Sequence, residues 1–142
     1  MFKSISKVEG IVECSHNETY KYNYHKWSSF FCLGETSKKM REAISASHKF
    51  IKENHVKFLI VDLKDCSDAF SEDDQKWVND VAIPFEKKLG IQYFVTVVAD
   101  DFYAELSMED WQGETEDFIT YINVHSFEEA EDWIKAKQAQ AV

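Results

Sequence analysis

The chain has 142 residues, of which 44% are hydrophobic and 30% charged, and its formal net charge is −10. This length and composition predict one folded domain over residues 1–142 and exclude a disordered chain. The negative charge disfavours binding to nucleic acid or to anionic lipid surfaces, because their phosphate groups repel it.

The cysteines and the N-terminal residues bear on the cellular compartment. Cys14, Cys32 and Cys66 are widely spaced and form no CxxC pair, which favours free thiols in a reducing cytosol. The first residues lack the apolar run of a signal peptide, and no segment approaches ~18 consecutive apolar residues. We therefore expect a cytoplasmic protein without a transmembrane segment.

Two strands are predicted near the N-terminus, at about residues 4–14 and 18–27, with a turn at Asn17. In the second strand, tyrosines alternate with polar residues, so Tyr22 and Tyr24 share one face and the polar side chains the other. A helix at about 37–54 follows, and Thr36 or Ser37 is its expected N-cap.

The rest of the chain alternates strands and helices. Strands are predicted at about 56–63, 91–99 and 118–125, and helices at about 72–89, near 101–109 and after Ser126. Pro84 must kink the second helix or begin a new one, and Gly90 ends it. This order predicts an α/β domain with a mixed sheet of four or five strands and three to five helices.

Three segments carry a family resemblance: IVDLKDCSDAFSEDDQKW, GIQYFVTVVADDF and FITYINVHSFEEAEDWIK. With them the chain resembles a STAS-type domain, and more narrowly the SpoIIAA-like branch, over residues of about 56–137. The resemblance implies the single-domain fold of the anti-sigma-factor antagonists. In those regulators a kinase phosphorylates a serine in a DSSG segment, which here falls on Phe70 to Asp73. Only Ser71 remains of the two serines, and Glu72 stands at the usual phosphoacceptor position.

Ser71 therefore has two interpretations, a phosphorylated switch or the N-cap of the helix that follows. The cap is favoured, because it also accounts for the three acidic residues after Ser71, which complement the positive end of the helix dipole. These same carboxylates would repel a phosphate.

The loop after the 56–63 strand is the predicted interaction or switch site. In open α/β sheets, ligands often bind outside the carboxyl ends of the strands. That edge offers Asp62, Asp65, Ser67 and Asp68, together with Ser71. The acidic residues lack the spacing and the glycine of a calcium loop, so we expect no metal.

An apolar ligand pocket is the alternative site. Some SpoIIAA-like proteins resemble lipid-transfer domains of the CRAL-TRIO type, which implies a hydrophobic pocket or membrane association. If residues 100–117 form a flap over such a pocket, its lining would be Phe102, Tyr103, Leu106, Met108 and Trp111.

No catalytic residues are predicted. The histidines form no tight ligand pair, and His48 and His55 are expected at the surface. Nucleophile motifs and glycine-rich phosphate loops are absent. We therefore expect a non-enzymatic regulatory or protein-interaction module without cofactors, whose partner is another protein or a second copy of the chain. The alternative is a carrier or sensor of a small apolar, lipid-like ligand.

Overall fold

The computed structural model describes residues 1–66, 68–98 and 119–140, and its described strands form one six-stranded sheet. The strands lie side by side in chain order: β1 (Phe2–Val8), β2 (Val12–Asn17), β3 (Tyr22–Trp27), β4 (Phe58–Asp62), β5 (Tyr93–Val97) and β6 (Thr120–Val124). The strands from β1 to β3 are antiparallel, and those from β3 to β6 are parallel. The α/β class and the mixed sheet are confirmed, with six strands instead of four or five.

The additional strand arises within residues 4–14, which the apolar pattern predicts as one strand. A turn at Gly10 divides them into β1 and β2, and the N–H of Ile11 donates to the carbonyl of Val8 at 3.0 Å. Gly10 has φ 75°, a backbone conformation that glycine adopts without a Cβ clash. At the predicted turn, the Asn17 side chain accepts hydrogen bonds from the N–H of Thr19 and Tyr20.

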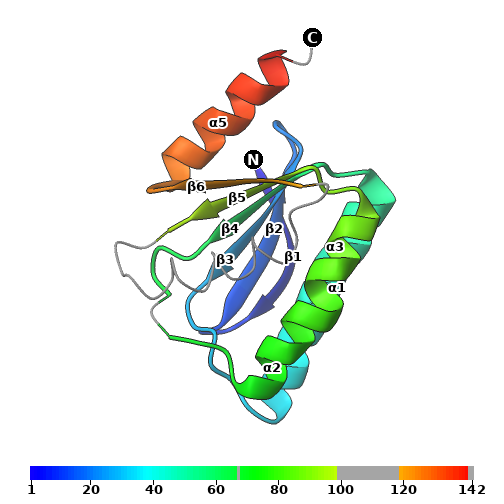
Figure 1. The fold of residues 1–142 in the computed structure, drawn as a ribbon, viewed down its shortest axis with the longest axis vertical. Helices are drawn as coiled ribbons and strands as arrows, with labels where there is room; N and C mark the ends of the chain where they lie inside the picture. The colour runs from blue at the N-terminus through cyan, green and yellow to red at the C-terminus, as the bar shows by residue number, and fades with distance from the viewer. Residues whose placement is uncertain (67, 99–118, 141–142) are drawn as a thin grey trace.

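The helices lie on both faces of the sheet (Figure 1). One face carries α1 (Glu35–Asn54) and the continuous segment of α2 (Glu72–Trp77), η1 (Val78–Ala82) and α3 (Ile83–Leu89), and the other carries α5 (Phe127–Gln140). β4 is apolar on both sides, as predicted. Leu59 and Val61 belong to the core under α1, and Phe58 and Ile60 belong to the core under α5.

Pro84 explains why η1 is a π-helix. A proline has no N–H to donate, and in a regular α-helix its ring would clash with the carbonyl four residues earlier, that of Asp80. The backbone widens before Pro84, and the N–H of Ile83 donates to the carbonyl of Val78, five residues earlier. The helix axis thereby continues from α2 into α3, and Gly90 ends α3 with φ 91°.

The predicted caps differ in outcome. Neither Thr36 nor Ser37 caps α1, because Gly34 is its N-cap and the helix begins at Glu35. At the start of α5, the N–H of Glu129 donates to the Ser126 hydroxyl at 3.1 Å, so Ser126 caps this helix. Of the helices in the described residues, none combines the length and hydropathy needed to cross a membrane.

Candidate functional site

Asp62 ends β4 and is buried within the fold. Its carboxylate accepts hydrogen bonds from the Tyr24 hydroxyl and from the N–H of Lys64, the latter at 3.0 Å. Burial, together with this carboxylate, raises the pKa of Tyr24, so its hydroxyl stays protonated as the donor. Asp65 is exposed, and Ser67 lies outside the described residues.

Asp68 connects the loop after β4 to the loop after β3. Its carboxylate accepts hydrogen bonds from the Ser29 hydroxyl at 2.5 Å and from the N–H of Phe30 at 2.6 Å. Burial tends to raise the pKa of Asp68, but these donors stabilise the charged form and lower the pKa overall. The carboxylate therefore has structural partners within the chain.

Ser71 is the N-cap of α2, as predicted. Its backbone is extended, and its hydroxyl accepts a hydrogen bond from the N–H of Asp74 at 3.3 Å. The Asp74 carboxylate is fully buried and accepts hydrogen bonds from the Ser37 hydroxyl at 2.6 Å and from Nε of Arg41 at 3.0 Å. Burial alone would raise the pKa of Asp74, but these two donors lower it. Asp74 thus anchors α2 to α1.

The predicted apolar pocket under residues 100–117 lies outside the described residues. This applies to all of its predicted lining residues, Phe102, Tyr103, Leu106, Met108 and Trp111. The flap and its pocket remain a prediction from the sequence.

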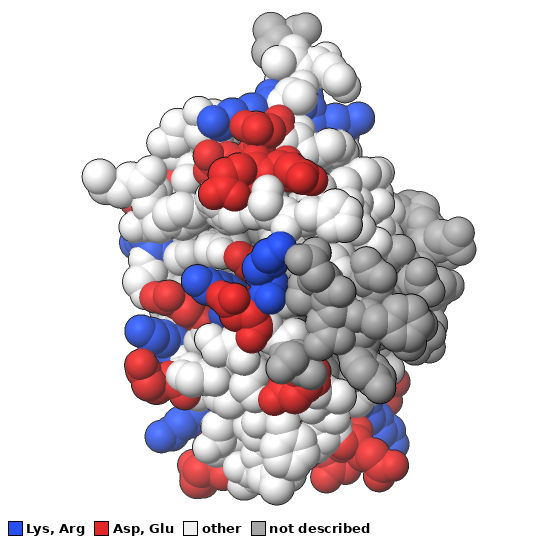
Figure 2. All heavy atoms as spheres, turned by 90° about the vertical axis from the view of Figure 1, so that its left-hand side faces the viewer, with Lys and Arg blue, Asp and Glu red and all other residues white. Residues whose placement is uncertain are grey.

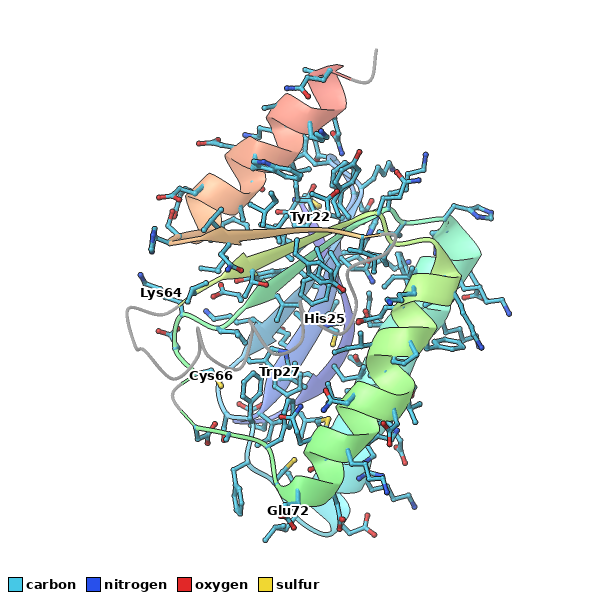
Figure 3. All side chains as sticks on the ribbon, in the orientation of Figure 1. Tyr22, His25, Trp27, Lys64, Cys66 and Glu72 are labelled. Carbon is cyan, nitrogen blue, oxygen red and sulfur yellow. The ribbon has the colours of Figure 1, made fainter. Side chains whose placement is uncertain are left out.

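The surface position predicted for His48 is wrong, because its exposed fraction is 3%, whereas His55 is exposed as predicted. His25 is likewise 3% exposed. The alternation in β3 directs Tyr22 toward α5 and His25 toward α1 (Figure 3). The polar face of β3 is therefore covered by α1 instead of solvent.

A chain of hydrogen bonds connects the buried polar side chains under α1. Nδ1 of His16 lies 2.8 Å from Oδ1 of Asn23, and Nδ2 of Asn23 donates to the Ser47 hydroxyl at 2.9 Å. Nε2 of His25 lies 2.6 Å from the same hydroxyl. We call His16, Asn23, Ser47 and His25 the polar chain. The Asn23 nitrogen also lies 3.5 Å from the carbonyl of Ser47, which can only accept.

His16 donates to Asn23, because the amide oxygen can only accept, and Asn23 donates to the Ser47 hydroxyl. Among the described residues this hydroxyl has no other acceptor than Nε2 of His25, so we assign Ser47 as the donor to His25. Desolvation, with a smaller contribution from nearby His48, lowers the pKa of His25 to about 3, so its ring is neutral. The remaining ring nitrogen, Nδ1, then carries the proton of His25.

A cavity of about 50 Å³ lies between the sheet and the segment from α2 to α3. Apolar side chains make up most of its wall: Trp27, Met40, Ile44, Val61, Phe70, Trp77, Val78, Ala82, Ile83 and Phe94. Its polar lining residues are His25 and Glu86, and Nε2 of His48 lies 3.1 Å from Oε2 of Glu86. Val78 and Ala82 belong to η1, and such π-helical turns recur at functional sites.

Two surface grooves meet at Ser45 and Trp77 and run between α1 and the segment from α2 to α3. We call them together the helix groove. One part has a volume of about 650 Å³ and includes Leu33 and Ser71, and the other has about 360 Å³ and includes Phe85. Large apolar side chains are exposed along it: Leu33 at 62%, Val81 at 49% and Phe85 at 43%.

Basic side chains form the α1 wall of the helix groove. They are Lys38, Arg41, Lys49 and Lys52, which are spaced so that they share one face of α1. Arg41 is paired with Asp74, but none of the three lysines forms an ion pair among the described residues. Figure 2 shows the opposite side of the molecule, where acidic side chains gather at the level of α5.

The acidic residues of the helix groove are confined to one part of it. Glu42 and Asp73 line the part beside Leu33, whereas none of the described residues that line the part beside Phe85 carries a carboxylate. The Lys49 and Lys52 side of the groove is therefore positive in a chain whose formal net charge is −10.

The three cysteines are buried. Burial raises the pKa of Cys14 to about 12, of Cys32 to about 11 and of Cys66 to about 12, so the thiols are protonated near neutral pH and are poor nucleophiles. Within residues 1–66, 68–98 and 119–140, no group of three His, Cys, Asp or Glu side chains is placed to hold a metal ion.

Comparison of the chain with protein-family models, with curated proteins and with solved structures gave no match. The geometry of the described residues therefore carries the functional argument.

The sequence contained part of the signal for the helix groove. Trp77, Val81 and Phe85 recur at helical spacing, a pattern that predicts a buried stripe, yet Val81 and Phe85 are exposed. The sequence pattern does not reveal that α1 covers only the side of this helix that carries Val78 and Ala82. The polar chain was missed because buried and solvated polar faces have the same alternation.

Proposed function

We propose that this chain is a non-catalytic, STAS-like regulatory module that binds a protein partner through the helix groove. The partner contributes an acidic amphipathic helix. The observation that carries this proposal is the exposure of Val81 and Phe85 directly beside Lys49 and Lys52. Exposed apolar side chains that lie together, edged by charge, are typical of interaction surfaces.

The apolar side chains favour a helical partner. Trp77, Val81 and Phe85 lie four residues apart along one side of the segment from α2 to α3. A helix that docks beside them would bury its own apolar stripe at the same repeat, as in other helix-in-groove complexes. The basic side chains from Lys38 to Lys52 extend over about 21 Å of α1 at 1.5 Å per residue, which matches a partner helix of about four turns.

The charges favour an acidic partner. Lys49 and Lys52 are exposed and have no acidic partner among the described residues. Opposite charges on the two sides of an interface speed association and exclude wrong partners. The acidic loop after β4 offers weaker support for docking, because Asp62 and Asp68 already accept hydrogen bonds within the chain.

Ser71 adds a means of regulation to this proposal. It lines the end of the helix groove near Lys38 and Arg41. A negative charge on Ser71 would reduce the attraction of this end for an acidic helix. The STAS resemblance puts the usual phosphoacceptor position at Glu72, one residue after Ser71, so the groove position of Ser71 and not the resemblance carries this part of the proposal.

Site-specific photo-crosslinking in the source cells tests the proposal. A photoreactive residue replaces Val81, and the crosslinked peptides are sequenced by mass spectrometry. We expect an acidic amphipathic segment of another protein, and the yield should fall in the Lys49→Glu/Lys52→Glu background. Crosslinks to basic peptides, or to peptides without an apolar helical stripe, would contradict the proposal. An equal crosslinking yield when the photoreactive residue replaces Lys57 instead of Val81 would also contradict it.

A further inference from the structure

The cavity under η1 contains a polar group with no partner in the described part of the chain. The His25 ring makes one hydrogen bond there, through Nε2 to Ser47, and His25 is among the lining residues of the cavity. The side chain is 3% exposed, so bulk water does not solvate it. A buried donor without an acceptor is costly, and such groups are usually satisfied by water or by a ligand.

The direction of the polar chain determines what this group offers. Because Nε2 of His25 accepts from Ser47, Nδ1 is the ring nitrogen that carries hydrogen. The cavity therefore presents one hydrogen-bond donor in an otherwise largely apolar wall. The other polar lining residue, Glu86, is engaged by His48 at 3.1 Å.

A second unsatisfied polar atom lies on the same face of the sheet. The Thr96 hydroxyl is buried without a hydrogen-bond partner, and Thr96 pairs with Val61 in the register, as Val61 pairs with His25. Among the described residues, the Thr96 hydroxyl is the one fully buried side-chain polar atom without a partner, and it lies across Val61 from His25.

We propose that the cavity is a binding site for a small, neutral molecule with a compact apolar body and one hydrogen-bond acceptor, which accepts the Nδ1–H of His25. A volume of about 50 Å³ admits a compact group of a few heavy atoms. The ligand should be neutral, because the His25 ring in the cavity wall is uncharged and supplies no counter-charge. A carbonyl between short alkyl groups meets these demands.

Acetone and isobutene are the matched probes, since they share a shape and differ in the acceptor. In NMR spectra of the full chain we expect saturable shifts on adding acetone, intermolecular NOEs from its methyl groups to Trp27, and a downfield shift of the His25 Nδ1 proton. Isobutene should leave the chemical shift of that proton unchanged. Non-saturating shifts spread over the chain, or NOEs to water alone at His25, would overturn the proposal.

A pair of variants locates the site. Val61→Ile adds one methylene to the cavity wall, and it should raise the dissociation constant for acetone by about fivefold or more. Val124→Ile makes the same chemical change in the core under α5, outside the cavity, and should leave the constant unchanged. Equal constants in both variants would contradict binding in this cavity. If Val61→Ile does not fold, the NOEs in the unaltered chain still decide the question.

Discussion

Arg41 and Asp74 form an ion pair between α1 and α2, in which Nη2 of Arg41 lies 3.0 Å from Oδ1 of Asp74. Arg41 also lies over the ring of Trp77, with its Cζ 5.6 Å from the ring centroid. Both Arg41 and Trp77 line the helix groove, whereas Asp74 is buried beneath it. The pair therefore holds the two walls of the groove at a fixed spacing.

Replacement of Asp74 should destabilise the fold. Asp74→Ala leaves the Ser37 hydroxyl and the Arg41 guanidinium without their acceptor, and we expect a loss of about 2–3 kcal/mol in the free energy of unfolding. Urea denaturation followed by tryptophan fluorescence measures it. Asp73→Ala, one residue earlier and exposed, is the control and should change the free energy by less than about 0.5 kcal/mol. A similar, small effect for both would contradict the anchoring role of Asp74.

The cap at Ser71 should contribute measurably to the free energy of unfolding. Ser71→Ala removes the acceptor for the N–H of Asp74 and should lower the free energy of unfolding by about 1 kcal/mol, whereas Ser71→Asp should retain most of it. Ser126→Ala at the cap of α5 provides the comparison. If Ser71→Ala leaves the free energy of unfolding unchanged while Ser126→Ala lowers it, the hydroxyl of Ser71 is not a stabilising cap.

The same position should affect partner binding in a different way. Ser71→Asp keeps the cap but adds a negative charge at one end of the helix groove, so affinity for an acidic helix should fall while stability is kept. Ser71→Asn keeps the cap without the charge and should bind as the unaltered chain does. Isothermal titration with one acidic peptide compares the two, and equal affinities would argue against regulation through Ser71.

The buried His25 should make stability depend on pH. Burial lowers its pKa from the ordinary value of about 6.5 to about 3 on folding, so between these values the unfolded chain binds the additional proton. Stability is therefore lost as the pH falls through this window, with a slope of about 1.4 kcal/mol per pH unit from this group. His16, whose pKa burial also lowers, acts in the same direction.

His25→Phe tests this dependence. The variant should be less stable at neutral pH, because Ser47 loses its acceptor, but its stability should fall less steeply between pH 6 and pH 4. Urea midpoints at several pH values give the two slopes. An unchanged slope in His25→Phe would show that the buried ring does not carry the pH dependence.

The sequence predicted the features that local chemistry determines. Ser71 as a cap, the turn at Asn17, the end of α3 at Gly90 and the two apolar faces of β4 follow from neighbouring residues. The turn at Gly10 was missed because apolar residues continue on both sides of it.

The parts that the sequence did not predict depend on tertiary packing. Lys38 and Lys49 lie on an ordinary solvated helix face until the segment from α2 to α3 packs beside α1 and turns that face into a wall. Similarly, nothing in the alternation of β3 indicates that Ser47 arrives from α1 to meet His25. Long-range contacts of this kind have no signal in local spacing.

Peptide titration monitored by NMR tests the docking of an acidic helix most directly. The probe is a designed four-turn helix with an apolar stripe flanked by Glu, and the control replaces each Glu with Lys. We expect the acidic peptide to shift signals of Trp77, Val81 and Phe85, with affinity that falls as salt is added. The Lys49→Glu/Lys52→Glu variant should bind it far more weakly than Lys7→Glu/Lys57→Glu, which has the same net charge. Equal binding by these two variants, or by the two peptides, would contradict the helix groove as the docking surface.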